Sequence, residues 1–216
     1  MGATRENDHP PLLALFKELQ TAQLDDHHEN LVPPAAICHT APMRDVSRIQ
    51  AAVRDVPDFP KPGIVFKDIT PVLGDGGLFR EAIDLFAETL LGKGVTKIVG
   101  IDARGFIFAS AVAYKLGVGF VPVRKKGKLP WTTHAAEYEL EYGNAIVEIH
   151  TDAVAPGEKV ALIDDVLATG GTAAAALKLL HSCGAEVVCA QFLMELGFLK
   201  GRVQLENTPV DSLLIF

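Results

Sequence analysis

One segment in the last third of the chain limits the possible folds more than any other. The apolar run from Val160 to Ile163 has the length of a buried strand, and two adjacent carboxylates, Asp164 and Asp165, follow it directly. A short loop with two glycines comes next and leads into an alanine-rich stretch that favours a helix. A strand, a glycine loop and a helix in this order predict an α/β protein with a parallel sheet.

The glycine loop has the features of an anion site. Gly170 and Gly171 let the backbone turn so that several N–H groups converge, and the start of a helix adds free N–H groups and a positive dipole end. Thr169 and Thr172 add hydroxyl donors. We therefore expect a dianionic phosphate to bind at a loop that contains no lysine and comprises Ala168, Thr169, Gly170, Gly171 and Thr172.

The two carboxylates before this loop predict a second part of the same site. A ribose 2,3-diol offers hydroxyl donors at a suitable distance from its own 5-phosphate, so Asp164 and Asp165 are candidates to accept hydrogen bonds from a sugar. They are also candidates to touch a divalent metal, directly or through water. Three alternatives are weaker. P-loop nucleotidases would need GxxxxGK[ST], dinucleotide-binding folds would need GxGxxG, and a purely structural turn would not explain why acids, glycines and threonines occur together.

Alternating patterns predict the rest of the fold. We expect an α/β fold with a mostly parallel central sheet flanked by helices, because strand patterns alternate with helical ones after residue 43. Ligands of such sheets bind beyond the carboxyl ends of the strands. Helices are predicted at 44–56, 78–91, 105–116 and 171–183. A short extended segment is predicted at 64–69, and strands at 97–101, 119–123, 145–150, 159–163, 186–194 and 212–216. Loops are predicted at 57–63 and 124–144.

Charge and cysteine content limit the kinds of partner. The chain has 20 Lys and Arg against 27 Asp and Glu, a net charge of −7, which disfavours broad binding to nucleic acid or to an anionic membrane. One local basic run suits a small, highly charged anion; it contains Arg124, Lys125, Lys126 and Lys128. Three cysteines without a CxxC motif, the absence of a secretory leader pattern, and an apolar stretch at 106–123 that charges and glycines interrupt predict a cytoplasmic protein without a membrane span.

Residues 1–43 differ from the rest and are predicted to be an extension that the chemistry does not need. An acidic and histidine-rich cluster at 25–29 and the pair Pro33 and Pro34 interrupt any regular pattern there. The regular pattern begins just after Met43. We therefore expect one domain over residues 44–216 and a mobile segment before it.

Five segments together resemble a known family. The Asp–Asp and glycine-loop segment resembles the phosphoribosyl-pyrophosphate motif of the type I phosphoribosyltransferases. Four further segments narrow the resemblance to the adenine phosphoribosyltransferases: PDFPKPGIVFKDI at 57–69, GIDARGF at 100–106, VRKKGKLP at 123–130 and YELEYG at 138–143. The resemblance implies the type I phosphoribosyltransferase-like fold, with a small N-terminal base-binding hood and a flexible lid loop at 129–143, and a homodimer.

The resemblance implies the synthesis of AMP from adenine and 5-phosphoribosyl 1-pyrophosphate (PRPP), with release of pyrophosphate and with Mg²⁺ as the cofactor. The metal would be held by pyrophosphate and the ribose hydroxyls, with Asp164 or Asp165 as the candidate protein ligand. Arg104 would reach pyrophosphate from a turn that the family holds with a cis peptide, here between Asp102 and Ala103. The basic run would supply further pyrophosphate contacts, from Lys128 and from Lys125 or Lys126, which in this family can come from the neighbouring subunit.

The lid would exclude water and carry a catalytic group. By resemblance, Glu141 would move the proton on the N7/N9 side of the purine, and Tyr142 beside it would orient or stack on a substrate. Trp131 and His134 match no fixed family pattern, so their roles stay open.

The hood would recognise the base. By resemblance, backbone groups of Val65 and Lys67 would distinguish adenine, and Phe66 would stack on one face of the purine. Val166 would lie on the opposite face, where family members commonly carry Leu. Two alternative functions remain: transfer to another purine base, and a PRPP-sensing regulatory protein on the same fold. The presence of Glu141 favours turnover over sensing.

Overall fold

The computed structural model describes residues 45–140, 143–205 and 207–216. The expected extension at 1–43 lies outside these ranges, and so do Glu141 and Tyr142. Within the described ranges, no helix is both long and apolar enough to cross a membrane. The expectation for 106–123, a helix followed by a strand, is confirmed by α5 (Gly105–Leu116) and β4 (Gly119–Lys125).

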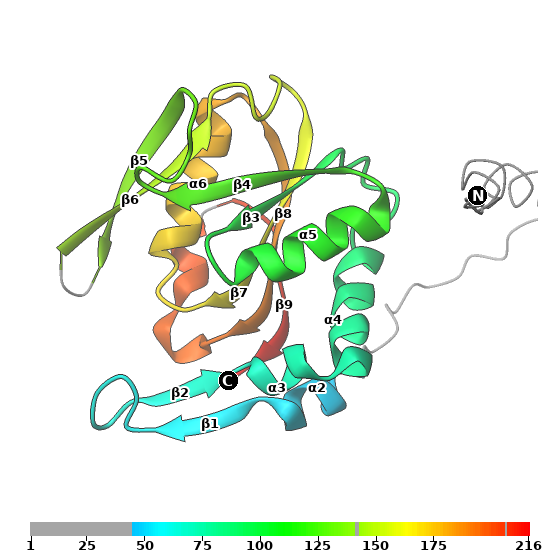
Figure 1. Ribbon diagram of the computed structural model, residues 1–216, viewed down its shortest axis with the longest axis vertical. Helices are drawn as coiled ribbons and strands as arrows, with labels where there is room; N and C mark the ends of the chain where they lie inside the picture. The colour runs from blue at the N-terminus through cyan, green and yellow to red at the C-terminus, as the bar shows by residue number, and fades with distance from the viewer. Residues whose placement is uncertain (1–44, 141–142, 206) are drawn as a thin grey trace, which may run out of the picture. The chain divides into compact units, whose positions relative to one another are not determined.

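The centre of the described chain is a seven-stranded sheet in the order β5-β6-β4-β3-β7-β8-β9 (Figure 1). The strands from β4 to β9 in this order pair in parallel, and the two hairpin strands pair antiparallel at one edge. The sheet thus confirms the predicted α/β fold with a mostly parallel sheet. The strands not yet bounded are β3 (Lys97–Ile101), β5 (Thr133–Leu140), β6 (Gly143–His150), β7 (Lys159–Leu167), β8 (Glu186–Glu195) and β9 (Val210–Ile215).

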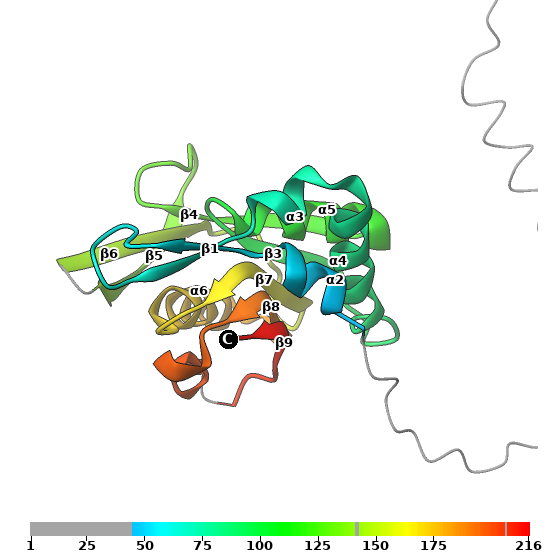
Figure 2. The same cartoon turned by 90° about the horizontal axis from the view of Figure 1, so that it is seen from below.

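Helices cover both faces of this sheet, with α4 (Gly76–Glu88) and α5 on one face and α6 (Gly171–Ser182) on the other (Figure 2). Successive residues of β3 illustrate why. Ile98 is fully buried in the core cluster that contains Phe108 of α5, and Val99 is fully buried in the cluster that contains Leu180 of α6. A central strand of a parallel sheet is apolar on both sides because each side packs against a helix.

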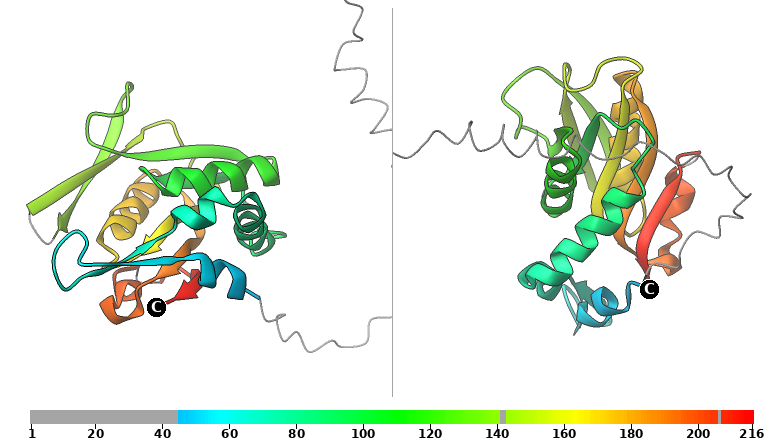
Figure 3. Two further views of the ribbon diagram at one scale, coloured as in Figure 1. Left: turned by 60° about the horizontal axis from the view of Figure 1, so that its bottom comes forward. Right: turned by 90° about the vertical axis from the view of Figure 1, so that its right-hand side faces the viewer.

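A small hairpin forms the unit that corresponds to the expected hood (Figure 3). Strand β1 (Arg54–Pro57) pairs antiparallel with β2 (Val65–Asp68), and the short helices α2 (Ser47–Ala52) and α3 (Thr70–Gly74) flank them. The helix expected at 44–56 is therefore wrong in its last part, because residues 54–57 become a strand. The strand at 54–57 pairs with residues 65–68, which lie beyond the proline-rich loop, so the local sequence pattern could not reveal this strand.

The loop expected at 124–144 is also wrong in part, because residues 124–125 extend β4 and residues 133–140 and 143–144 belong to the β5–β6 hairpin. Residues 133–140 pair along their whole length with residues 143–150. Ala136 is 7% exposed, and its neighbours Ala135 and Glu137 are exposed, which is the alternation of a strand with one buried side. The buried side packs against α6, and this packing stabilises the extended conformation. The sequence alone predicted a loop here because many of these residues are polar.

Candidate active site

A cleft of about 430 Å³ lies at the carboxyl ends of β3 and β7, where parallel sheets bind their ligands. Its lining combines residues 101–104, residues 164–173, Lys125 and Tyr138. The predicted phosphate loop, the two carboxylates, Arg104 and Lys125 are therefore brought into one cleft.

The phosphate loop joins β7 to α6 and ends in a helix N-terminus. Gly170 has φ of +88°, a left-handed conformation that favours glycine, and its carbonyl accepts the backbone N–H of Ala174 at 2.9 Å. No side chain caps this end of α6. The first N–H groups of a helix have no acceptor within the helix, and they lie at the positive end of its dipole. The loop can therefore offer several N–H groups to one phosphate.

The two carboxylates lie within β7 rather than after it. The strand was predicted to end at Ile163, but it runs on to Leu167 because β8 continues to pair with it, Asp164 opposite Phe192 and Leu167 opposite Glu195. Asp165 is only 3% exposed. Its backbone N–H donates to Oδ1 of Asp164 at 2.9 Å.

Burial disfavours the charged form of both carboxyl groups. Burial, followed by the negative charge of Asp165, raises the pKa of Asp164 well above its usual value. Burial also raises the pKa of Asp165, and the nearby Arg104 opposes that shift. Hydroxyl donors or a cation placed at the pair would offset the cost of its buried charge.

Arg104 supplies the positive charge nearest to the pair. It follows the peptide bond between Asp102 and Ala103, which is cis as expected. Its Nε lies 2.6 Å from Oδ2 of Asp165, and its guanidinium lies 5.6 Å from the centre of the Phe66 ring. With 43% of its side chain exposed, Arg104 can also meet an anion that enters the cleft.

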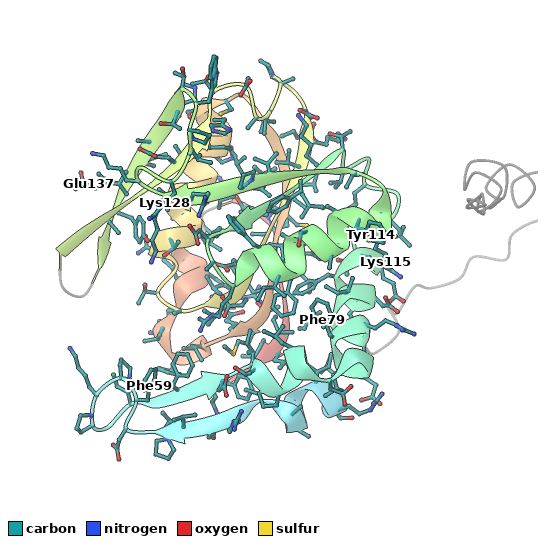
Figure 4. All side chains as sticks on the ribbon, in the orientation of Figure 1. Phe59, Phe79, Tyr114, Lys115, Lys128 and Glu137 are labelled. Atoms are coloured by element: carbon teal, nitrogen blue, oxygen red, sulfur yellow. The ribbon has the colours of Figure 1, made fainter. Side chains whose placement is uncertain are left out.

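The basic run divides into three parts. Lys125 lines the cleft, whereas Lys126 and Lys128 are exposed and are not among its lining residues; Figure 4 labels Lys128 in the connection between β4 and β5. Arg124 has a structural role, because its Nε donates to Oδ2 of Asp102 at 3.3 Å and its Nη1 donates to the carbonyl of Lys128 at 3.1 Å. Arg124 thus links the turn before Arg104 to the end of the basic run.

Three of the predicted base-binding residues, Val65, Phe66 and Lys67, lie on β2, outside the lining of the cleft. Phe66 approaches the cleft through its contact with Arg104, and Phe59 packs edge-on against it at 5.2 Å between ring centres. The Nζ of Lys67 lies 2.6 Å from Oδ1 of Asp55 and 4.4 Å from the centre of the Phe216 ring. Because β2 pairs with β1 on one side only, part of its backbone is available to a ligand. Val166 does line the cleft.

Comparisons with known proteins identify the family. A model of the phosphoribosyl transferase domain matches residues 75–198. The adenine phosphoribosyltransferase of Anaeromyxobacter dehalogenans is 57% identical over 168 residues, which cover 78% of this chain and 98% of that protein. The chain belongs to the adenine phosphoribosyltransferase family.

Solved structures of this family share the fold. The adenine phosphoribosyltransferase of Thermoanaerobacter pseudethanolicus is 51% identical, with a TM-score of 0.77 over 79% of this chain and 99% of that one. The enzyme of Saccharomyces cerevisiae, solved with an imino-altritol bisphosphate and adenine, is 44% identical, with a TM-score of 0.75 over 78% of this chain and 97% of that one. The family and the type I phosphoribosyltransferase-like fold expected from the sequence are thus confirmed.

The extent of the domain match separates two parts of this adenine phosphoribosyltransferase family member. Residues 75–198 include Arg104, Lys125 and the whole segment 164–173, which line the cleft. They exclude the β1–β2 hairpin at 54–68. The shared phosphoribosyltransferase domain therefore accounts for the cleft, whereas the hairpin lies outside it.

Tyr138 and Asp102 line the cleft although the sequence argument assigned them no role. A signal for Tyr138 was present, because residues 136–140 alternate apolar and acidic side chains as a half-buried strand does. No such local signal marks Asp102, whose partner is Arg124 of the neighbouring strand.

Proposed function

We propose that this chain transfers the 5-phosphoribosyl group of PRPP to adenine and releases AMP and pyrophosphate. The observation that carries the proposal is the meeting of a helix N-terminus, a buried pair of carboxylates and Arg104 in one cleft of about 430 Å³. The names of the relatives, which are 50–57% identical over about four-fifths of the chain, support adenine as the base. No observation favours another purine base or a regulatory PRPP sensor.

The donor would bind across the end of β7. The loop residues Ala168, Thr169, Gly170, Gly171 and Thr172 would hold the 5-phosphate through backbone N–H groups and hydroxyls. Asp164 and Asp165, a few residues earlier, would accept hydrogen bonds from the ribose 2- and 3-hydroxyls. This placement supports the proposal because the carboxylates are buried and donors there would offset their burial.

Cleavage of the bond between C1 and oxygen develops positive charge on the ribose and negative charge on pyrophosphate. Arg104 would then move from Asp165 toward the leaving group, where a planar guanidinium can bind two phosphate oxygens. Lys125 would assist from the same cleft. Lys126 and Lys128 are exposed, so they are placed to contact a leaving group bound to this chain or to a second copy.

Mg²⁺ fits this donor set as an ion carried by the substrate. Within the described residues there is no group of three or more His, Cys, Asp or Glu side chains that could hold a metal by themselves. Mg²⁺ is commonly bound through one or two carboxylates together with substrate phosphates, which matches Asp164 or Asp165 with pyrophosphate and the ribose hydroxyls. When bound, the ion neutralises negative charge that develops on the phosphate oxygens.

Adenine would bind between the hairpin and β7. Backbone groups of Val65 and Lys67 would read the edge of the base, and Phe66 and Val166 would lie on its two faces. Glu141, which lies outside the described residues, would hold the proton on the N7/N9 side of the purine, with Tyr142 as its neighbour. Residues 129–143, which include β5, would act as the lid and exclude water from the donor.

The proposal includes a homodimer in the cytoplasm. Large apolar side chains are exposed on α5 and β4, with Tyr114 90%, Ile107 39% and Phe120 37% accessible, and such side chains suit contact with a partner subunit; Figure 4 labels Tyr114 on α5. Cys183 and Cys189 are both free thiols, which suits a reducing compartment. Light scattering during size-exclusion chromatography would measure the mass; a monomer at micromolar concentration would contradict the dimer.

A base-panel assay tests the function. The full chain is incubated with PRPP, Mg²⁺ and adenine, guanine or hypoxanthine, and pyrophosphate release is measured. We expect turnover with adenine; turnover with guanine alone would overturn the assignment. Arg104→Gln should lower kcat/KM by about a hundredfold. The matched control is Arg48→Gln. It removes an ion pair with Glu81, and neither residue lines the cleft, so the rate should be unchanged.

A further inference from the structure

Two glycines from distant parts of the chain bring backbone against backbone behind the phosphate loop. Gly201 begins the 3-10 helix η2 (Gly201–Leu205) and is buried. A Cβ atom on Gly201 would lie 2.3 Å from the carbonyl oxygen of Ala168 and 3.1 Å from the backbone nitrogen of Gly170. A Cβ atom on Gly170 would in turn lie 2.3 Å from the carbonyl oxygen of Gly201. Neither position has room for any side chain, so the loop rests directly on η2.

Arg202 fixes η2 to the sheet. Its Nε donates to Oε1 and Oε2 of Glu195, both at 2.8 Å, and its Nη1 donates to the carbonyl of Val210 at 2.9 Å. The hydroxyl of Ser212 donates to Oε2 of Glu195 at 2.8 Å. We call Arg202, Glu195 and Ser212 the Arg202 cluster. Its carboxylate is buried, with 6% of the Glu195 side chain exposed, and hydrogen bonds from Arg202 lower the pKa of Glu195.

The Arg202 cluster is attached to the sheet at the level of the phosphate loop. Glu195 of β8 lies opposite Leu167, the last residue of β7 before the loop. The backbone N–H of Leu196 donates to the carbonyl of Leu167 at 2.9 Å. The phosphate loop and η2 are therefore both anchored at the same place in the sheet. The loop leaves β7 at Leu167, and Arg202 ties η2 to Glu195, which lies opposite Leu167.

We propose that Gly201 and Arg202 are positioning residues for the 5-phosphate of the donor, acting through the backbone of the phosphate loop. The inference rests on the proposed function. The N–H groups that bind a phosphate must converge on one point, and the loop has no lysine that could compensate for a displaced N–H group. A rigid backing behind Ala168 and Gly170 maintains that convergence without touching the ligand.

Loss of the backing should therefore affect one substrate selectively. A displacement of the loop by a fraction of an ångström weakens several hydrogen bonds to the phosphate together, whereas adenine binds on the hairpin side of the cleft. A merely structural role for Arg202 would lower thermal stability and leave the KM values alone. The ratio of the KM for PRPP to the KM for adenine separates the two cases.

The first experiment compares three graded variants with one matched control, all in the full chain at 25 °C. Ser212→Ala removes the hydroxyl that donates to Glu195 and accepts from Arg202, Arg202→Lys keeps the charge without the forked geometry, and Arg202→Gln removes the charge. Arg202→Gln should raise the KM for PRPP about tenfold, with the KM for adenine changed less than about twofold. The effects of the three variants should increase in the order given. Arg48→Gln, which breaks the ion pair with Glu81, should change neither KM.

A glycine pair tests the contact itself. Gly201→Ala should raise the KM for PRPP at least as much as Arg202→Gln, because its Cβ would overlap the carbonyl of Ala168. Gly74→Ala is the control, since a Cβ there would meet nothing within 4 Å. If Gly201→Ala does not fold, the Arg202 series decides.

The outcomes also separate this inference from the proposed function. If the wild type turns over adenine and every variant that folds has the wild-type KM for PRPP, the positioning role is refuted and the function stands. If the wild type has no turnover, isothermal calorimetry with PRPP replaces kinetics. The same about tenfold loss of affinity in Arg202→Gln would then support the inference, and unchanged affinity would refute it.

Discussion

Replacement of Gly105 by alanine gives a sharp test of how the two halves of the cleft are held together. Gly105 is the first residue of α5 and is buried against β7. A Cβ atom there would lie 2.6 Å from Oδ1 of Asp164 and 3.0 Å from the carbonyl oxygen of Ile163. Since Cβ contacts shorter than 3.0 Å are essentially never found, Oδ1 of Asp164 would have to move away by at least roughly 0.4 Å, either by a turn of its side chain or by a separation of α5 from β7.

The free-energy cost of this movement depends on how freely the atoms around the new Cβ can shift. Ile163 is fully buried in a central strand, so its carbonyl cannot move away freely. Forced insertion of one methyl group into a packed site typically costs about 1–3 kcal/mol, which corresponds to a fall in Tm of about 2–12 °C for a domain of this size. Displacement of the Asp164 carboxylate beside Arg104 should also raise the KM for PRPP by about tenfold.

Gly76→Ala is the matched control for Gly105→Ala. Gly76 is also the first residue of a helix, α4, but a Cβ there would meet nothing within 4 Å. Urea denaturation would give the free energy of unfolding of both variants, and initial rates at varied PRPP would give KM. A Gly105→Ala protein with the stability and the KM of Gly76→Ala would show that the close approach of α5 to Asp164 has no functional consequence.

Three further predictions test other parts of the site. Asp165→Asn should weaken PRPP binding measured by calorimetry, because it removes an acceptor for the ribose and the partner of Arg104; unchanged affinity would remove Asp165 from the donor site. Glu141→Gln should lower kcat more than it changes the affinity for PRPP, as rapid-quench and binding measurements would show; equal effects on both would argue against proton transfer. Residues 43–216 expressed alone should keep the kcat/KM of the full chain within about twofold, since no proposed site residue precedes Val65; a soluble but inactive product would contradict an extension that the chemistry does not need.

Local patterns predicted the elements whose neighbours in sequence are also their neighbours in space. The strand at 97–101 and the helix at 105–116 have the bounds that periodicity predicts, because each is mostly apolar and a turn residue, Asp102 or Gly117, follows it directly. The pattern failed where long-range pairing decides the conformation. Residues 133–140 are polar on one side and become a strand only because β6 and α6 are there to receive the other side.

The candidate site divides in the same way. The phosphate loop and the carboxylates are contiguous in the sequence, so their common chemistry could be predicted from residues 164–172 alone. Arg104 and Lys125 reach the same cleft because β4, β3 and β7 are neighbours in the sheet, and that order depends on how the helices pack on both faces. The resemblance to a family supplied their expected roles, but no local spacing could have placed them.

By itself, the sequence determined that this chain has a glycine loop at a helix N-terminus, two carboxylates just before that loop, and a local cluster of basic residues at 124–128. These properties depend on residue types at short spacing, which backbone geometry converts directly into a binding surface. Only the tertiary structure decided that Arg104 pairs with Asp165, that Arg124 joins Asp102 of the cleft to the end of the basic run, and that Gly201 lies against the phosphate loop. The Arg124–Asp102 and Arg104–Asp165 contacts join residues 22 and 61 positions apart, and their free energy depends on packing that no single segment contains.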